Sequence, residues 1–353
     1  MVVNGIAAIV RENWERFGLA PPAPARLQFL KASSGVGSTK IIFLGFADTA
    51  RFPVVVAKVA QSGAERMRRT HDLLLRLRPE LPSSLRRAIP RPLVVTTIGD
   101  ATVAIESYLP GRRMYRFHAR RPSWAQRRGI ERDFDLAGSW LIALHQATRS
   151  ETAVTPERVR GWFAQPLDAF KKRMQPSPAE LAALERALAA LTDTLGARMP
   201  LVWQQGDYWP RNLLVLDDRL GVCDWEWSSS AELPFLDVFL FPLSYSFLLG
   251  GDLPNRDALR EGLRTAFLAR GWFAEVCRGF VAAHMEALAL DPALGPSFFH
   301  LMLLHMAVRD YLATGCPSRN DLRHRDLLRT AVEEEVATRG WLKDLPRDRT
   351  DAG

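Results

Sequence analysis

The spacing of apolar residues changes near residue 109, and this change limits the folds that the chain can adopt. Residues 26–108 contain short segments rich in β-branched and aromatic residues, such as PVVVAKVA at 53–60, separated by glycine and proline turns. Such segments are typical of β-strands. After residue 109, apolar residues recur mostly at helical spacing, as in PAELAALERALAALTDTL at 178–195. The sequence therefore predicts fold class α+β, with a sheet-rich part followed by a larger, mainly helical part.

Five strand-like segments lie in the first part, and they predict one sheet. These are residues 26–33, 38–46, 53–60, 91–98 and 102–109. Helical spacing precedes them at 1–18 and separates the third from the fourth at 62–79, so the predicted order is helix–β–β–β–α–β–β. We expect an N-terminal domain over residues 1–108 and a second domain over residues 109–345.

Two acidic motifs interrupt the helical part. In QQGDYWPRN, Asp207 stands five residues before Asn212, and in VCDWE, Asp224 stands twelve residues after Asn212. The flanking segments LVWQ, NLLVLD and RLGVCD are strand-like, so the motifs would lie at strand ends. One carboxylate can deprotonate a hydroxyl, while an amide oxygen and a second carboxylate hold Mg²⁺ against nucleotide phosphates. This spacing predicts phosphoryl transfer from ATP, whereas turns on the surface or a glycosidase built on Asp224 and Glu226 are the weaker interpretations.

Two features of the N-terminal part also suit a nucleotide. The turn SSGVGS contains Gly35 and Gly37, which allow backbone N–H groups to approach phosphates, and Ser38, which adds a hydroxyl. An ordinary hairpin turn is the alternative. Lys58 lies inside the apolar segment 53–60, where an ammonium group is costly unless it meets an anion. The phosphates of ATP would supply that anion, and the alternative is a lysine that extends to solvent from an edge strand.

Together these segments resemble the aminoglycoside phosphotransferase family, which includes enzymes similar to choline kinase and homoserine kinase. QGDYWPRNLLV resembles the catalytic loop of that family, CDWEW its metal-binding motif, and ELPFLDV the segment that follows. The resemblance extends over residues 28–315. It implies a bilobal protein-kinase-like fold, with an antiparallel five-stranded sheet and a helix in the N-terminal lobe and a larger helical C-terminal lobe.

The resemblance implies a role for each matching residue of the two motifs. Asp207 would be the catalytic base, and Asn212 and Asp224 would be the metal ligands. Glu226 would lie beside the metal or on the substrate side. The family commonly has histidine at the position of Gln205, where it braces the loop through hydrogen bonds, and glutamine can also donate and accept them.

The resemblance also implies nucleotide contacts in the N-terminal lobe. Lys58 would bind the phosphates and pair with an acid of the following helix, with Glu65 the first candidate and Asp72 the second. The backbone carbonyl of Glu106 and the N–H of Tyr108 would contact adenine. The remaining predicted nucleotide contacts are Gly35, Gly37 and Ser38.

The segment after Asp224 favours a small acceptor over a protein. Gly206 stands where a regulated protein kinase has arginine, and no long activation segment follows Glu226. The expected activity is therefore an ATP- and Mg²⁺-dependent kinase of a small hydroxyl compound, such as a sugar, an amino alcohol or an aminoglycoside. One alternative is a pseudokinase that binds nucleotide as a scaffold, and another is a protein that binds anions or nucleic acid through its arginines.

Charge and cysteine content bear on location and partners. The formal net charge is +8, and the segment from Arg112 to Arg128 is rich in arginine without an acid. It is either a solvated surface or a site for an anionic ligand or a membrane surface; nucleic acid is not expected, since no nucleic-acid motif accompanies it. The three cysteines form no CxxC pair and no apolar run reaches the length of a membrane span, so we expect a reducing, cytoplasmic location.

Overall fold

The computed structural model describes residues 2–18, 26–35, 38–47, 50–61, 63–118, 122–249, 256–336 and 340–345. The chain forms two compact units, which we describe separately. The first consists of Met1–Arg112 and Leu214–Ser228, and the second consists of Arg113–Leu213 and Ser229–Gly353. Among the described residues, no helix combines the length and the apolar character needed to cross a membrane. The predicted division at residue 108 stays a prediction about functional domains.

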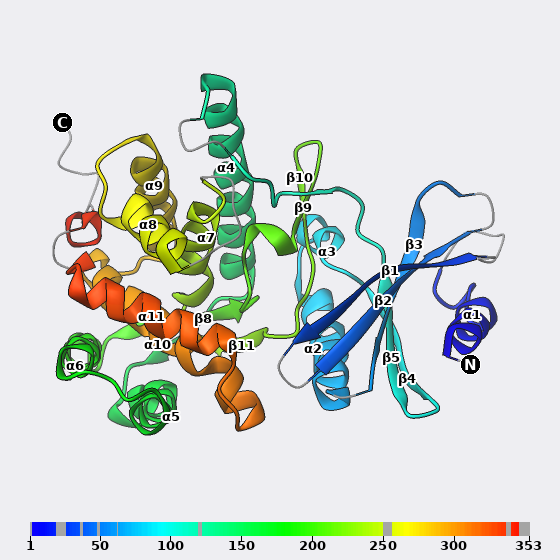
Figure 1. Ribbon diagram of the computed structural model, residues 1–353, viewed down its shortest axis with the longest axis horizontal. Coiled ribbons are helices and arrows are strands. Elements are labelled where there is room, and N and C mark those ends of the chain that lie inside the picture. The colour runs from blue at the N-terminus through cyan, green and yellow to red at the C-terminus, as the bar shows by residue number, and fades with distance from the viewer. Residues whose placement is uncertain are drawn as a thin grey trace. The chain divides into compact units, whose positions relative to one another are not determined.

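The first unit is built around the predicted antiparallel sheet of five strands (Figure 1). The structure shows that its strands lie in the order β1-β2-β3-β5-β4. The short helix α3 follows Pro82 and was not predicted, because six residues are too few to show a helical period. The elements are α1 (Val2–Glu12), β1 (Arg26–Gly35), β2 (Ser38–Phe46), β3 (Pro53–Ala60), α2 (Ala64–Glu80), α3 (Ser83–Ala88), β4 (Pro92–Ile98), β5 (Ala101–Ser107) and the hairpin strands β9 (Leu213–Leu216) and β10 (Arg219–Val222).

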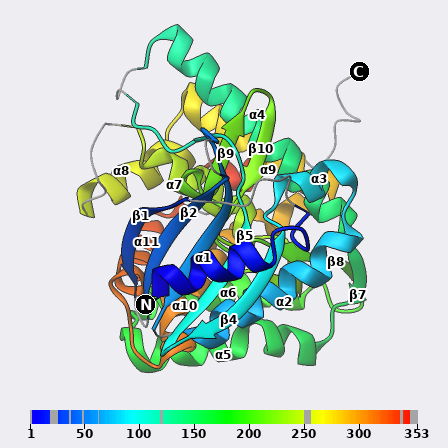
Figure 2. The ribbon, with the colours of Figure 1, turned by 90° about the vertical axis from the view of Figure 1, so that its right-hand side faces the viewer.

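Alternation along β3 and β5 gives the sheet two different faces. On one face, Val55 and Ala57 of β3 and Val103 of β5 are buried against Ile6 and Val10 of α1. Figure 2 shows α1 lying across the sheet. Burying each of these larger side chains stabilises the unit by roughly 1.5–3 kcal/mol. The residues that alternate with these along β3 and β5, such as Lys58 and Ala104, face the opposite side of the sheet, where α2 lies.

The second unit is mainly helical, which confirms the fold class. Its elements are β6 (Arg112–Arg113), α4 (Trp124–Ala147), β7 (Ser150–Ala153), α5 (Pro156–Met174), α6 (Pro178–Thr192), β8 (Arg198–Gln204), η1 (Pro210–Asn212), β11 (Ser229–Glu232), α7 (Leu236–Ser246), α8 (Arg256–Phe267), α9 (Trp272–Ala287), η2 (Pro292–Leu294), α10 (Gly295–Thr314), α11 (Arg319–Glu333) and η3 (Trp341–Asp344). Strands β11, β8 and β7 form a small antiparallel sheet with β8 in the centre.

Helix α10 is the central helix of the second unit. It packs against α5, α6, α7 and α11, and its side chains are apolar on nearly all sides, which is typical of a fully buried helix. Arg309 and Asp310 are the charged residues of this helix. A charge on a buried helix is costly unless it is paired and hydrogen-bonded, so both side chains need polar partners.

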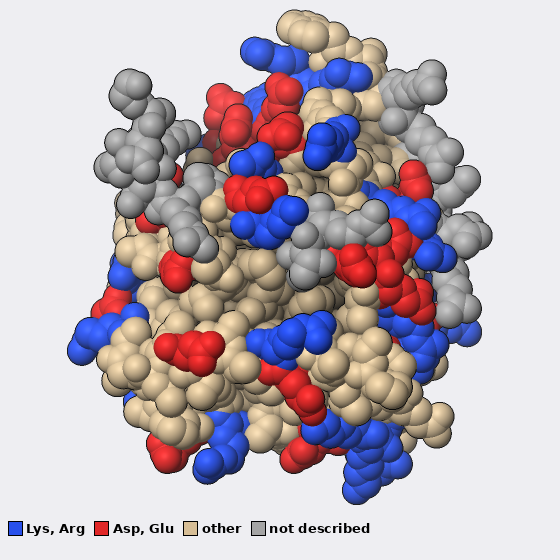
Figure 3. All heavy atoms as spheres, turned by 90° about the vertical axis from the view of Figure 1, so that its left-hand side faces the viewer, with Lys and Arg blue, Asp and Glu red and all other residues tan. Residues whose placement is uncertain are grey.

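The arginine-rich segment has several different contacts. Arg116 pairs with Asp133 (Nη2–Oδ2 3.1 Å), and Arg127 lies 5.2 Å from the ring centre of Trp272. Arg112, Arg113 and Arg128 are exposed, while Arg120 and Arg121 lie outside the described residues. On the face drawn in Figure 3, positive and negative side chains are interspersed. Binding of an anionic ligand or a membrane surface by this segment stays a prediction.

Candidate active site

The opposite face of the sheet brings Lys58 and Glu106 together. In the pairing of β3 with β5, Lys58 lies opposite Ala104, and Glu106 is two residues further along β5. The two side chains are therefore diagonal neighbours on one face, a distance that long side chains can span. The Lys58 Nζ lies 2.9 Å from the Glu106 Oε1, and both side chains are largely buried.

The carboxylate of Asp224, which follows the β9–β10 hairpin, helps to raise the pKa of the same lysine. Burial alone would lower the pKa of Lys58, but the carboxylates of Glu106 and Asp224 outweigh this effect and raise it. The side chain therefore stays a cation. Asp224 follows β10 with a φ of 61°, a left-handed conformation that costs energy for most residues and that Asp and Asn tolerate best.

A pocket of about 450 Å³, its open mouth included, surrounds these groups. The ion pair of Lys40 with Glu226 lies in the same pocket. Charged groups therefore line one part, and apolar residues of α2 and β5 line another, including Met67, Leu74 and Ala104. Such a combination suits a ligand with a polyanionic end and an apolar ring system, as a nucleotide has.

Lys58 pairs with a different acid from the one that the sequence analysis expected on the following helix. The structure pairs the lysine with Glu106 of β5, whereas Glu65 is exposed in the first turn of α2. Alternation and strand register, which place Glu106 on the face of Lys58, were the sequence signals that could have found this pair. A role of Glu65 in nucleotide binding stays a prediction.

The remaining predicted nucleotide contacts lie at the β1–β2 turn and at the end of β5. Gly35 and Ser38 are opposite each other at the ends of β1 and β2, and Gly37 lies outside the described residues. The N–H of Tyr108 donates to the carbonyl of Val54 (2.9 Å), so this donor is used within the first unit. The proposed adenine contacts stay predictions.

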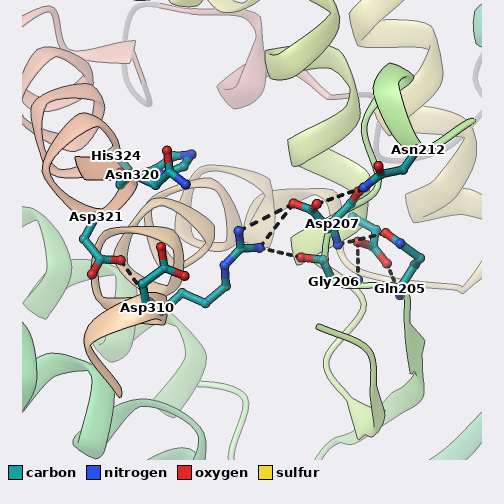
Figure 4. Close-up of polar contacts among 10 residues, drawn as sticks. Gln205, Gly206, Asp207, Asn212, Asp310, Asn320, Asp321 and His324 are labelled. Carbon is teal, nitrogen blue, oxygen red and sulfur yellow. Dashed lines mark hydrogen bonds and ion pairs between the residues drawn. The ribbon is translucent and has the colours of Figure 1, made fainter. Parts of the chain in front are cut away.

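In the second unit, the loop after β8 brings Asp207 and Asn212 together, as the spacing predicts (Figure 4). The Asn212 Nδ2 donates to the Oδ2 of Asp207 (2.8 Å) and to its carbonyl (3.0 Å). Because the amide nitrogen faces Asp207, the amide oxygen of Asn212 faces away from that carboxylate. Oxygen is the ligand atom that Mg²⁺ requires.

A buried carboxylate from α7 holds the start of this loop. The backbone N–H groups of Gln205 and Gly206 donate to Asp237 Oδ2 (2.5 Å) and Oδ1 (2.9 Å). Gly206 has a φ of 80°, a conformation that favours glycine. Burial raises the pKa of Asp237 to about 7, although the two backbone donors act to lower it. The segment ELPFLDV contains Asp237, yet only the fold shows this bracing contact.

Two further residues anchor the loop. The Oε1 of Gln205 accepts a hydrogen bond from the N–H of Asp207 (2.8 Å), so glutamine does brace this loop. Tyr208 is fully buried, and its hydroxyl donates to the carbonyl of Ala137 in α4 (2.8 Å). The candidate base is therefore carried by a segment with several fixed points.

Arg309 of α10 also reaches this loop, a contact that no sequence pattern indicated. Its Nη1 donates to the carbonyl of Gly206 (2.8 Å), and its Nη1 and Nη2 lie 3.4 and 3.5 Å from the Oδ1 of Asp207. The two residues are 102 positions apart in sequence. Helical periodicity places Arg309 on a helix but does not identify its partner.

Because the pKa of Asp237 is raised, we expect the stability of the protein to depend on pH. A carboxyl group whose pKa rises from 3.8 to about 7 on folding contributes stability that is fully present below about pH 4 and is lost as the pH rises through about 7. We expect Asp237→Asn to remove this pH dependence. We also expect it to lower the free energy of unfolding by about 1–3 kcal/mol, since asparagine has an NH₂ donor in place of one of the two oxygens that accept from the backbone N–H groups. Urea unfolding below and above neutral pH tests this, with the exposed Asp168→Asn as control; an unchanged pH dependence would contradict it.

The residues present fit magnesium. Asn212 and Asp224 both offer hard oxygen ligands, the kind that magnesium takes together with water and phosphate. In the described part of the chain there is no cluster of three or more His, Cys, Asp or Glu side chains that could hold a metal. A site with one or two protein ligands plus the phosphates of a nucleotide would not form such a cluster.

Several solved structures share this fold. A candidate aminoglycoside phosphotransferase from Ralstonia eutropha is 14% identical, with 94% of this chain and 98% of that chain covered and a TM-score of 0.54. A candidate fructosamine-3-kinase from Thermobifida fusca is 17% identical, with 95% and 99% covered and a TM-score of 0.51. A thermostable mutant of aminoglycoside phosphotransferase APH(4)-Ia, solved with AMP-PNP and hygromycin B, is 14% identical, with 93% and 98% covered and a TM-score of 0.51.

These likenesses define the class of the fold as protein-kinase-like. No protein with a curated function matches the chain in sequence. The model of one family, described as the phosphotransferase enzyme family, matches residues 45–241, which is more than half of the chain. The chain therefore belongs to the phosphotransferase enzyme family, and the resemblance noted in the sequence is confirmed.

Proposed function

We propose that this protein transfers the γ-phosphoryl group of ATP to a hydroxyl group of a small molecule. The observation that carries the proposal is the contact between Asp207 and Asn212 on a loop that Asp237 and Gln205 brace. Phosphoryl transfer needs little covalent chemistry from the protein, so positioning and charge supply most of the rate enhancement. A braced carboxylate beside an amide is suited to that task.

The reaction is ATP + R–OH → ADP + R–O–phosphate + H⁺. The acceptor oxygen forms a bond to the γ-phosphorus, and the bond from that phosphorus to the β,γ-bridging oxygen breaks. The proton of the hydroxyl passes to the carboxylate of Asp207 and then to solvent. Asn212 and Asp224 would hold Mg²⁺, which when bound neutralises charge on the phosphates.

The nucleotide-binding groups belong to the first unit. Lys58 stays cationic beside Glu106 and Asp224, and its ammonium group would bind the phosphates of ATP. The apolar part of the pocket would receive the adenine ring. Glycines and Ser38 at the β1–β2 turn would contact the phosphates.

The acceptor is proposed to be a sugar, an amino alcohol, an aminoglycoside or a related metabolite. Family membership supports phosphotransfer, and a structure with this fold is named with hygromycin B and an ATP analogue. After Glu226 the chain passes through the short strand β11 directly into α7, with no segment of the length that a peptide platform requires.

A substrate panel tests the proposal. Purified protein is incubated with ATP and Mg²⁺ and with sugars, amino alcohols or aminoglycosides, and ADP release and the phosphorylated product are measured. We expect turnover that depends on both Mg²⁺ and one acceptor class. Nucleotide binding without turnover across the panel would instead support a non-catalytic scaffold, and salt-sensitive binding of polyanions without ATP would support an anion-binding protein.

The role of Lys58 makes a separate prediction. We expect Lys58→Met to weaken the affinity for Mg·ATP by about 10–100-fold, because a hydrogen bond to a charged group contributes about 1.5–3 kcal/mol. Isothermal titration calorimetry measures this affinity. Lys171→Met is the matched control, since Lys171 is half-exposed and contacts Glu185 of α6. Equal affinities for the wild type and Lys58→Met would remove the lysine from the nucleotide site.

A further inference from the structure

A cationic side chain on the mainly apolar helix α10 reaches the loop that carries the candidate base. Arg309 follows Val308, which is fully buried, and its own side chain is only 17% exposed. Burying a guanidinium group is costly unless it is paired and hydrogen-bonded. Its position on this helix is therefore explained by what it contacts.

The guanidinium group contacts two successive residues of the loop. It donates to the carbonyl of Gly206 and lies beside the Oδ1 of Asp207, whereas Asn212 donates to the Oδ2. The two oxygens of the Asp207 carboxylate thus have different partners, one from α10 and one from the loop itself. Two anchors on two oxygens fix the plane of the carboxylate.

The distances from Arg309 show that it contacts the Gly206 carbonyl more closely than the Asp207 carboxylate. The contacts of 3.4 and 3.5 Å between Arg309 and Asp207 are longer than the 2.7–2.9 Å typical of the strongest charge-assisted hydrogen bonds. The bond to the Gly206 carbonyl, at 2.8 Å, is a short one. Arg309 is therefore fixed mainly by the backbone and directs the carboxylate without engaging it in a close ion pair.

We propose that Arg309 is a positioning residue, which fixes the orientation of the Asp207 carboxylate toward the acceptor hydroxyl. This inference rests on the proposed function, because it assigns Asp207 the role of base. A base must lie within hydrogen-bonding distance of the proton it removes, and a displacement of about 1 Å can cost about 10²-fold in rate. The planar guanidinium contacts the Gly206 carbonyl through Nη1 and the Asp207 carboxylate through both Nη1 and Nη2, and the single ammonium group of lysine can reproduce this arrangement only in part.

Steady-state kinetics of the full chain test the proposal. We expect Arg309→Ala to lower kcat by about 10–100-fold and to leave KM for ATP within about 2-fold, since only the step after nucleotide binding is affected. Arg309→Lys should recover a minor part of the loss. Arg173→Ala is the matched control, because Arg173 donates to the hydroxyl of Tyr311 on the same helix (2.8 Å) without contacting the loop.

Chemical rescue separates positioning from support of the fold. Free guanidinium at non-denaturing concentration should restore part of the activity of Arg309→Ala, and it should leave the control unchanged. Wild-type kcat in Arg309→Ala would overturn the inference. So would a loss that guanidinium does not restore, or a loss that matches a fall in the folded fraction measured by thermal unfolding.

Failure of this inference can be told apart from failure of the proposed function. ATP hydrolysis without an alcohol acceptor, in which water receives the phosphoryl group, provides a second readout that needs no knowledge of the acceptor. A wild-type protein without Mg²⁺-dependent ATP turnover in either assay overturns the proposed function and this inference with it. An active wild type with an equally active Arg309→Ala overturns the inference alone.

Discussion

We expect Asp207→Ala to lower kcat by about 10²–10⁴-fold, the usual contribution of a general base. The same variant should still bind Mg·ATP, because the lysine and carboxylates that line the proposed nucleotide pocket belong to the first unit. Transfer kinetics with the best acceptor of the panel measure the first effect, and calorimetric titration with Mg·ATP measures the second.

Asp168→Ala is the control for this experiment, since Asp168 is exposed on α5. Thermal unfolding of both variants shows whether the loop without its carboxylate still folds. If Asp207→Ala retained the full rate of phosphoryl transfer, the assignment of the base would be wrong even though the family is established.

The second large effect concerns Asp224. We expect Asp224→Asn to abolish productive binding of Mg·ATP, because the substitution removes a charge from the proposed metal ligand while asparagine tolerates the left-handed backbone. Mg²⁺-dependent ATP titration and turnover measure the loss. Binding should become nearly independent of added Mg²⁺ if nucleotide alone still enters the pocket.

The hairpin offers a closely matched control. Asp217, in the turn between β9 and β10, also has a positive φ (54°) and belongs to the same unit. Asp217→Asn makes the same chemical change in the same backbone conformation, but on an exposed turn. A similar loss in both variants would show that the hairpin fold, rather than the metal ligand, was disturbed.

Local sequence patterns were sufficient for much of the fold. Valine-rich strands and helical spacing gave the five-stranded sheet and the helical second part, and the family match confirms the resemblance. The short strands β7 (SETA) and β11 (SSAE) were missed, because each is a polar edge strand of four residues. Only the apolar central strand β8 of that sheet has a recognisable pattern.

The site was predictable where its residues are close in sequence or share a strand pair. Asp207 and Asn212 follow from their spacing on one loop, and strand register could have paired Lys58 with Glu106. The contact of Arg309 with Asp207 depends on how α10 packs in the second unit. No local pattern encodes that packing, so only the folded chain reveals it.

The first unit is discontinuous, and this has a consequence for dissecting the protein. The segment Leu214–Ser228 supplies Asp224, and its strand β10 packs against α3, yet all of 113–213 separates it from the rest of that unit. A truncated fragment ending at residue 112 would lack both the hairpin and an acidic wall of the pocket. During synthesis, this unit cannot be completed until the ribosome has passed residue 228, and a chimera that exchanges it must graft two segments at once.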